Sequence, residues 1–124
     1  MPDLKKVNIL EKLNQIHDHW HPRIAGELNG QQIRLVKVKG EFPFHKHDHD
    51  DEMFLVIHGD LILDFQDKQV ELEEGEFLIV PKGVLHRPIA KEEVHLMMFV
   101  TAGNVNTGDL KNEQTLEADS LERI

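Results

Sequence analysis

The chain has 124 residues, the length of a single domain. Asp and Glu number 23 against 14 Lys and Arg, and the net charge of -9 disfavours nucleic acid and anionic membranes as partners. Cysteine is absent, which excludes disulfides and thiolate ligands, so that metal ligands must come from His, Asp and Glu. With no apolar signal segment and no apolar run of about 18 residues, we expect a cytoplasmic protein.

The first predicted element is an N-terminal helix. Apolar residues recur there at intervals of three and four: Ile9, Leu13, Ile16 and Trp20. Asn8 is the predicted N-cap, with Glu11 three residues later. We expect the helix to end near Trp20, which would anchor it on the core, because Pro22 disfavours a helical conformation at His21.

From residue 23 onward the chain consists of short β-type runs separated by turn residues. The clearest runs are 23–28, 32–38, 52–57, 61–65, 77–80 and 95–100. Asn29-Gly30 joins the first two as a predicted type I′ hairpin. Short strands at nearly even spacing indicate an all-β sandwich or barrel.

Several of these runs are apolar on both faces, as in "MFLVI" and "FLIV". A strand with one solvent-exposed face should alternate apolar and polar residues. Because these strands do not alternate, another part of the protein must cover their second face. The N-terminal segment, a second sheet or a second subunit could do so, and we expect a homodimer. Within a single domain we predict a helical segment over 1–22, a barrel over 23–102 and a partly ordered extension over 103–124 with at most a short helix.

Alternating histidines form the most informative motif, "HKHDHDDE", residues 45 to 52. Residues two apart on a strand face the same side, so that His45 and His47 can direct both imidazoles at one point. In a chain with 9 His this spacing alone is weak evidence, because polar side chains on an exposed strand or loop give the same pattern.

The residues around this pair resemble the two motifs of the cupin superfamily. The first motif is matched at Gly40, His45, His47, Glu52 and Gly59, and the second at Gly75, Pro81, Gly83 and His86. Two departures stand out: the interval from Gly40 to His45 is one residue short, and Ala90 occupies the final Asn position. With "NVNTGD" at 104–109, the chain resembles small single-domain cupins loosely labelled mannose-6-phosphate-isomerase-like.

The resemblance implies a double-stranded β-helix, the jelly-roll barrel, with one N-terminal helix. It implies one divalent transition metal per chain, held by four ligands: His45, His47, Glu52 and His86. Three imidazoles and one carboxylate suit Fe, Mn, Ni, Co or Zn and do not suit an all-oxygen Ca or Mg site. The expected function is a metal-dependent enzyme of the isomerase, decarboxylase or dioxygenase type acting on a small oxygen-rich molecule. The alternative is a non-catalytic small-molecule binding or sensor module.

Other side chains are candidates for the pocket around this site. The parity of Glu52 places Phe54 and Val56 on the pocket wall, with Met97 or Met98 as companions. Glu52 and His95 are weak candidates for an acid or base.

Further histidines are predicted to lie outside the site. His49 follows the strand in a turn-like "DHDD" and is expected on the rim or in solvent. His17 and His21 lie four apart, as metal ligands on a helix would, but a helix C-terminus attracts imidazoles for simpler electrostatic reasons.

Overall fold

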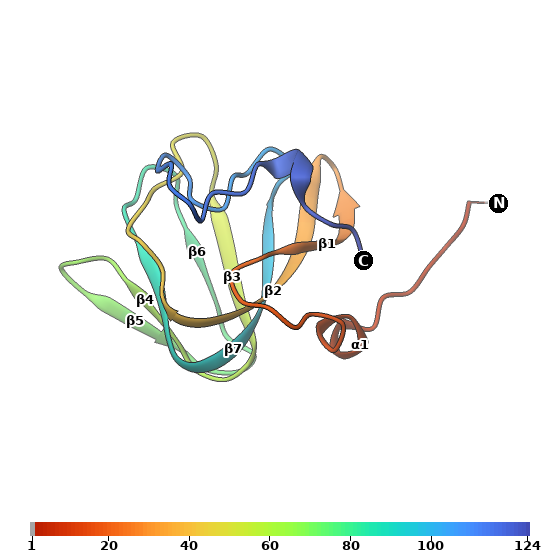
Figure 1. Cartoon of the computed structure of the whole chain (residues 1–124), viewed down its shortest axis with the longest axis horizontal. Helices are drawn as coiled ribbons and strands as arrows, with labels where there is room; N and C mark the ends of the chain where they lie inside the picture. The colour runs from red at the N-terminus through yellow and green to blue at the C-terminus, as the bar shows by residue number, and fades with distance from the viewer. Residues whose placement is uncertain (1) are drawn as a thin grey trace.

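The structure is a computed structural model that describes residues 2–124; Met1, the first residue of the predicted segment 1–22, lies outside the described residues. It consists of seven strands, one short helix and a 3-10 turn (Figure 1). In chain order these are α1 (Ile9–Leu13), β1 (Arg23–Leu28), β2 (Gln31–Glu41), β3 (Glu52–His58), β4 (Leu61–Asp64), β5 (Gln69–Leu72), β6 (Phe77–Val80), β7 (Arg87–Thr101) and η1 (Ala118–Ser120). The predicted all-β class with one N-terminal helix is confirmed.

β7 organises the sheet. Residues 95–99 of β7 lie between β2 and β3, and its first residues, 87–89, pair with β4, so that one strand belongs to both walls of the molecule. All of the strand pairs are antiparallel, in the order β1-β2-β7-β3-β6, with β4 paired to β7 and β5 paired to β4. Register shifts between Val38 and Gly40 and between Val56 and His58 mark bulges, which bend the strands. The sheet therefore curls into a barrel.

The first hairpin has the predicted turn. Asn29 and Gly30 both adopt positive φ, 52° and 76°, as a type I′ turn requires. β1 and β2 pair directly on either side of it, from Leu28 with Gln31 onward.

The barrel interior is a single cluster of aliphatic and aromatic side chains. Its buried members come from β2, β3, β4, β5, β6 and β7: Val36, Val38, Phe54, Val56, Leu61, Leu63, Leu72, Val80, Ala90, Val94 and Leu96. A second, smaller cluster lies outside the barrel, where Leu13 and Ile16 pack on Leu35 of β2. The N-terminal segment thus covers part of the outer apolar face.

The predicted helix is too long by almost two turns. The N-cap is confirmed, since Oδ1 of Asn8 accepts from the backbone N–H of Glu11 at 3.0 Å, but α1 ends at Leu13. After one further turn, closed by the bond from Ile16 N–H to Leu13 O at 3.0 Å, the chain bonds to the barrel. The Trp20 backbone N–H donates to Lys37 O at 2.9 Å and its indole N–H to Lys39 O at 2.9 Å. Trp20 has φ of +65°, which no helix allows. Tertiary hydrogen bonds have replaced the helical ones.

The C-terminal segment packs across one end of the barrel (Figure 1). Asn104 and Thr107 are buried, and the backbone N–H of Ile124 donates to Ile24 O at 3.0 Å on β1. Its one helical element is η1, a single 3-10 turn.

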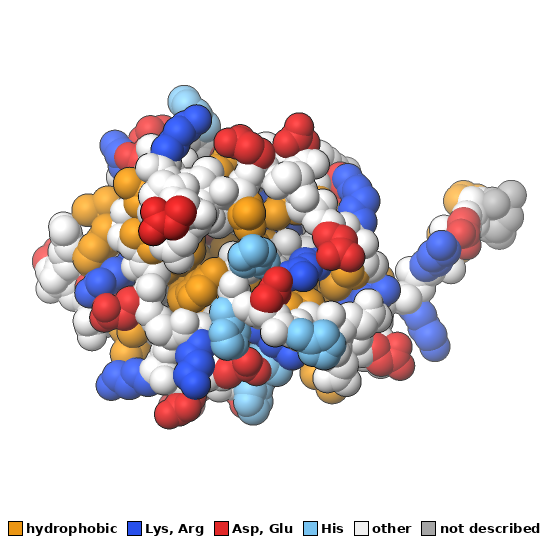
Figure 2. Space-filling model, viewed as in Figure 1, with side chains coloured by type: hydrophobic (Ala, Val, Ile, Leu, Met, Phe, Trp, Pro, Cys, Tyr) orange, Lys and Arg blue, Asp and Glu red, His pale blue; other side chains and the backbone are white. Residues whose placement is uncertain are grey.

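The surface carries charges of both signs interspersed with apolar side chains (Figure 2). On the edge strand β6, Phe77 is 58% exposed and Ile79 is 53% exposed. Within residues 2–124, no helix has the length and apolar character needed to cross a membrane.

Candidate metal centre

Two strand-like segments far apart in the sequence bring His45 and His86 together. The two residues form an isolated antiparallel bridge in which His45 N–H donates to His86 O at 3.0 Å and His86 N–H donates to His45 O at 2.9 Å. His47 lies two residues further along the same segment and therefore faces the same side. Glu52 is the first residue of β3, after the turn that contains His49.

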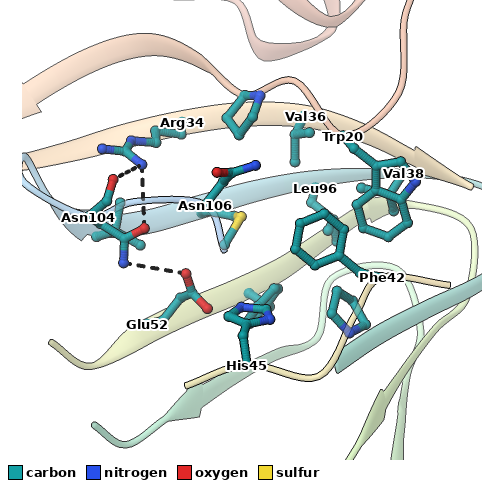
Figure 3. A pocket seen from close by; sticks show the side chains of 15 residues that line it. Trp20, Arg34, Val36, Val38, Phe42, His45, Glu52, Leu96, Asn104 and Asn106 are labelled. Atoms are coloured by element: carbon teal, nitrogen blue, oxygen red, sulfur yellow. Dashed lines mark hydrogen bonds between the residues drawn. The ribbon is translucent and has the colours of Figure 1, made fainter. Parts of the chain in front are cut away.

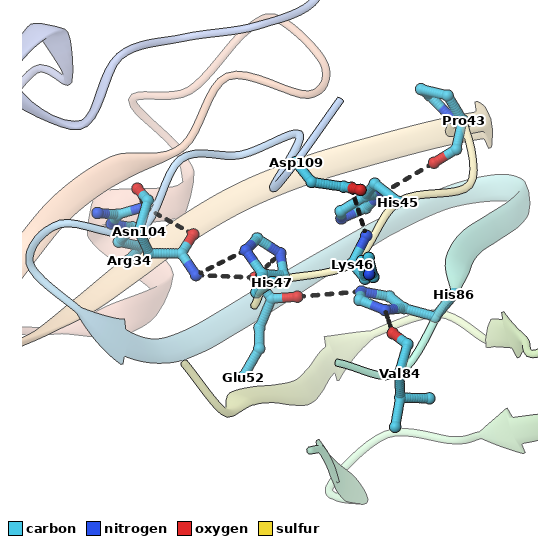
Figure 4. Close-up of polar contacts among 10 residues, drawn as sticks. All are labelled: Arg34, Pro43, His45, Lys46, His47, Glu52, Val84, His86, Asn104 and Asp109. Carbon is cyan, nitrogen blue, oxygen red and sulfur yellow. Dashed lines mark hydrogen bonds and ion pairs between the residues drawn. The ribbon is translucent and has the colours of Figure 1, made fainter. Parts of the chain in front are cut away.

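One donor atom from each of these four residues lies within 4.8 Å of the others, and all four residues are buried. Nδ1 of His45 donates to Pro43 O at 2.9 Å, and Nδ1 of His86 donates to Val84 O at 2.9 Å (Figure 4). These bonds fix each ring and leave its Nε2 as the free nitrogen, the arrangement usual for histidines that ligate a metal.

Nε2 of His86 lies 3.2 Å from Oε1 of Glu52. If Nδ1 carries the only proton of the His86 ring, then Nε2 of His86 and Oε1 of Glu52 are both hydrogen-bond acceptors. Two acceptors attract each other only when a proton or a metal cation lies between them. Nε2 of His47 is buried without a hydrogen-bond partner among the described residues, although Oε2 of Glu52 is 3.2 Å away. Both observations fit a site shaped for a cation.

The protonation states of Glu52 and His45 suit metal binding. Burial raises the pKa of Glu52, but hydrogen bonds and charge from His47 and His86 outweigh it, and the pKa falls to about 2. Burial lowers the pKa of His45 to about 4. At neutral pH these two residues are therefore a carboxylate and a neutral imidazole, the forms that bind metals. For His47, burial lowers the pKa but the hydrogen bond and charge of Glu52 outweigh it and raise the pKa, so that a metal ion would compete with a proton on this ring.

Two polar side chains beside the site, Asn104 and Arg34, were not predicted from the sequence. The amide nitrogen of Asn104 lies 3.3 Å from Nδ1 of His47 and 3.5 Å from Oε2 of Glu52 (Figure 4). Arg34 of β2, only 2% exposed, donates to the backbone oxygen of Asn104 at 2.9 Å. A signal for Arg34 existed, because it shares strand parity with Val36 and Val38, which face the core. Asn104 begins the "NVNTGD" stretch that resembles small cupins, but no role at the site was predicted for it.

A sequence model described as "Cupin domain" matches residues 32–102, more than half of the chain. The chain belongs to the cupin family. Residues of this cupin are 34% identical over 84 positions to an uncharacterized protein, YdbB, of Bacillus subtilis (strain 168), covering 67% of this chain and 74% of that protein. They are 30% identical over 109 positions to acireductone dioxygenase of Yarrowia lipolytica, covering 82% of this chain and 62% of the dioxygenase.

Solved structures agree with this assignment. A cupin-2 domain containing protein from Shewanella frigidimarina aligns with a TM-score of 0.74 at 43% identity, over 75% of this cupin and 91% of that chain. Protein NMB1881 from Neisseria meningitidis aligns with a TM-score of 0.72 at 32% identity, over 78% and 99% of the two chains. Hydroquinone 1,2-dioxygenase PnpCD has the same fold at 18% identity, with a TM-score of 0.64 over 76% and 71%.

A cavity of about 50 Å³ adjoins the site in this cupin and is lined by two of its four residues, His45 and Glu52 (Figure 3). One end is polar, with Arg34 and Asn104 beside Glu52, and at the other end Trp20 stacks on Phe42 with ring centroids 4.7 Å apart. Trp20 was expected to anchor a helix on the core. Trp20 does pack against the barrel core, but it lies beyond the end of α1, and its side chain also lines this cavity.

Of the predicted pocket residues, Phe54 and Met98 line the cavity. Val56 is fully buried in the barrel core and does not reach it. Met97 has the opposite parity to Met98 and packs with the outer cluster beneath α1.

His95 has the same outward parity as Met97 and does not face the cavity. Its Nε2 lies 2.9 Å from Oε1 of Glu93, whose other oxygen is 2.7 Å from Nε2 of His19. His49 is exposed and lies outside the four-residue group, as the turn composition predicted. His17 and His21 are also exposed and lie beyond the end of α1, so that a helix C-terminus does not explain them.

Proposed function

We propose that His45, His47, Glu52 and His86 bind one divalent transition metal ion, Fe, Mn, Ni, Co or Zn. The observation that carries the proposal is the buried convergence of four donor atoms within 4.8 Å. The partnerless Nε2 of His47 and the opposed acceptors of His86 and Glu52 support it. One carboxylate leaves the site with net positive charge, which favours an oxygen-rich, anionic ligand.

We further propose that the protein is a metal-dependent enzyme acting on a small oxygen-rich molecule. When bound, the ion supplies Lewis acidity and open coordination positions. The chain supplies the rest: an apolar wall that excludes water, a fixed carboxylate at Glu52, and Asn104 beside His47. Of isomerisation, decarboxylation and dioxygenation, the similarity to acireductone dioxygenase favours the last.

A non-catalytic binding or sensor module is the second candidate. One observation favours it: apart from the proposed ligands His45 and Glu52, Arg34 is the one ionisable side chain that lines the cavity in the described part of the chain. A guanidinium is a poor acid or base, since it stays protonated. His95, the other candidate, faces away. Any proton transfer would thus fall to Glu52.

Turnover experiments separate the two candidates. The protein, stripped by a chelator and reloaded with a single metal, is incubated with sugars, keto acids and diketones, with and without dioxygen. The enzyme proposal predicts consumption of one compound that needs both the metal and Glu52, with the Glu52→Gln variant inactive and His49→Ala fully active. Saturable binding without turnover across the panel would support the binding module instead.

We also propose that the protein is a homodimer. Apolar side chains on the outer face of β3, β6 and β7 lie next to one another in the strand register: Met53, Leu55, Phe77, Ile79 and Phe99. Exposed aromatic and aliphatic patches of this kind mark interfaces. Sedimentation velocity should find a dimer of the 14.4 kDa chain, and the double variant Phe77→Lys, Ile79→Lys should be monomeric. A wild-type monomer at micromolar concentration would refute the proposal.

A further inference from the structure

Arg34 is a buried cation whose partners are all neutral. Its Nε donates to Oε1 of Gln32 at 3.0 Å. Nη1 donates to Asn104 O at 2.9 Å and Nη2 to Ala102 O at 3.2 Å. Within residues 2–124 it forms no ion pair with a carboxylate, and only 2% of its surface is exposed. Burial of this charge lowers the pKa of Arg34, and the nearby Glu52 carboxylate, with which Arg34 forms no ion pair, offsets the effect only in part.

The guanidinium has spare donor capacity. It carries five N–H groups, and the contacts with Gln32, Ala102 and Asn104 use at most four of them, one of these a 3.5 Å contact to Oδ1 of Asn104. The neighbouring Asn106 is neutral and already engaged: its Nδ2 uses one of two N–H groups on Gln114 O at 2.8 Å, and its Oδ1 accepts from Leu116 N–H at 2.7 Å. Arg34 is therefore the charged donor at this end of the cavity, with one N–H left for a ligand.

The cavity has one charged end and apolar walls. Arg34 and Glu52 lie at the same end, and the walls between them and Trp20 are aliphatic, formed by Val36, Val38 and Leu96 among others (Figure 3). The charges of Arg34 and Glu52 cancel. A divalent ion held by the four-residue group would leave this end with a surplus of two positive charges, which a small anion would neutralise.

The volume of the cavity limits the size of the ligand. A cavity of about 50 Å³ is well below the roughly 150 Å³ that holds a benzene ring. While Trp20 and Phe42 stay stacked, a ring does not fit, whereas an acid of two or three carbons has the right scale.

We propose that Arg34 is the anion-selecting residue of this cupin and that the cavity takes a short-chain organic acid, with its carboxylate toward Arg34 and its carbon atoms on the apolar wall. This rests on the proposed function, because it assigns the substrate class of the same site. It adds a recognition residue that is not a metal ligand.

The test compares two probes of equal size that differ in charge, glycolate and its neutral analogue glycolamide. Trp20 is the only tryptophan and lines the cavity, so that its fluorescence reports binding. The wild-type protein should bind glycolate at least about tenfold more tightly than glycolamide. Arg34→Met should reduce this ratio at least about fivefold, Arg34→Lys should retain most of it, and Arg123→Met, which removes a surface charge, should leave it unchanged.

Each titration is run on zinc-loaded and on metal-free protein, which separates failure of this inference from failure of the metal proposal. A glycolate preference in metal-free protein that is lost in Arg34→Met supports the inference even if no metal binds. A preference seen only with zinc and equal in wild type and Arg34→Met overturns it while the metal site stands. If Arg34→Met does not fold, Arg34→Gln takes its place: a glycolate preference in zinc-loaded protein that is equal in the wild type and Arg34→Gln overturns the inference.

Discussion

At the scale of single residues, the backbone partners of the histidines define the site. Pro43 O and Val84 O each accept a hydrogen bond from Nδ1 of one ring, His45 or His86, and so fix which nitrogen faces the cluster. His47 has no such carbonyl; its Nδ1 faces the Asn104 amide, and its Nε2 is the partnerless atom. The metal proposal therefore depends on ring orientation and not only on residue type.

Glu93 offers a residue-scale prediction away from the metal site. Hydrogen bonds from His19 and then from His95 lower its pKa to about 2. A carboxyl carbon NMR titration should find that value in the wild type, and His19→Gln should move it toward the ordinary value near 4.5. An ordinary pKa in the wild type would show that the His19 contact does not form in solution.

The lowered pKa of Glu93 also affects the stability of the fold. A lowered carboxyl pKa contributes stability that is fully present above the unfolded value near 4.5 and is lost as the pH falls through about 2. The contribution should be small, because the Glu93 side chain is 43% exposed and solvent screens the pair.

At the scale of elements, two segments outside the strands complete the site. The C-terminal segment places Asn104 beside His47, and Asp109 of the same segment accepts a hydrogen bond from the Lys46 backbone N–H at 3.0 Å. The segment from His17 to Pro22 places Trp20 over the cavity.

A substitution at Gly108 tests the contact between the C-terminal segment and the segment that carries His45 and His47. A Cβ at Gly108 would lie 2.2 Å from Lys46 O, and its φ is +58°. Gly108→Ala should therefore lower the free energy of unfolding by about 1–3 kcal/mol and weaken metal binding. Gly103→Ala is the control, with nothing within 4 Å of the added Cβ, and should change stability by less than about 0.5 kcal/mol. Equal stability of the two variants in denaturant titrations would mean that the tail does not pack as described.

Trp20 tests whether the same segment sets the size of the ligand. Trp20→Ala should open the aromatic end of the cavity and admit mandelate, which is glycolate bearing a phenyl ring, while glycolate affinity changes little. Trp20→Phe, which keeps an aromatic ring against Phe42, should continue to exclude mandelate. Calorimetry follows both ligands. Tight mandelate binding by the wild type would show that Trp20 does not limit the cavity.

At the scale of the whole molecule, short strands at regular spacing predicted an all-β sandwich or barrel, and the resemblance to the two cupin motifs predicted the four residues that the structure brings together. One turn separates His47 from Glu52. His86 lies three residues after the Pro-Lys-Gly turn and directly before the final strand, β7. Trp20, Arg34 and Asn104 were not predicted as site residues. Their positions depend on contacts between segments distant in sequence, such as the Arg34 bond to Asn104 O and the Trp20 bond to Lys39 O.

The most direct test of the metal site is elemental analysis of purified protein after reloading and removal of unbound ions. The wild type and His49→Ala should each hold about one divalent transition metal per chain, because His49 is exposed and outside the cluster. His86→Ala should lose most of the metal while keeping the β-sheet circular dichroism spectrum. Equal metal content in the wild type and a folded His86→Ala variant would contradict the assignment of His45, His47, Glu52 and His86 as the metal site.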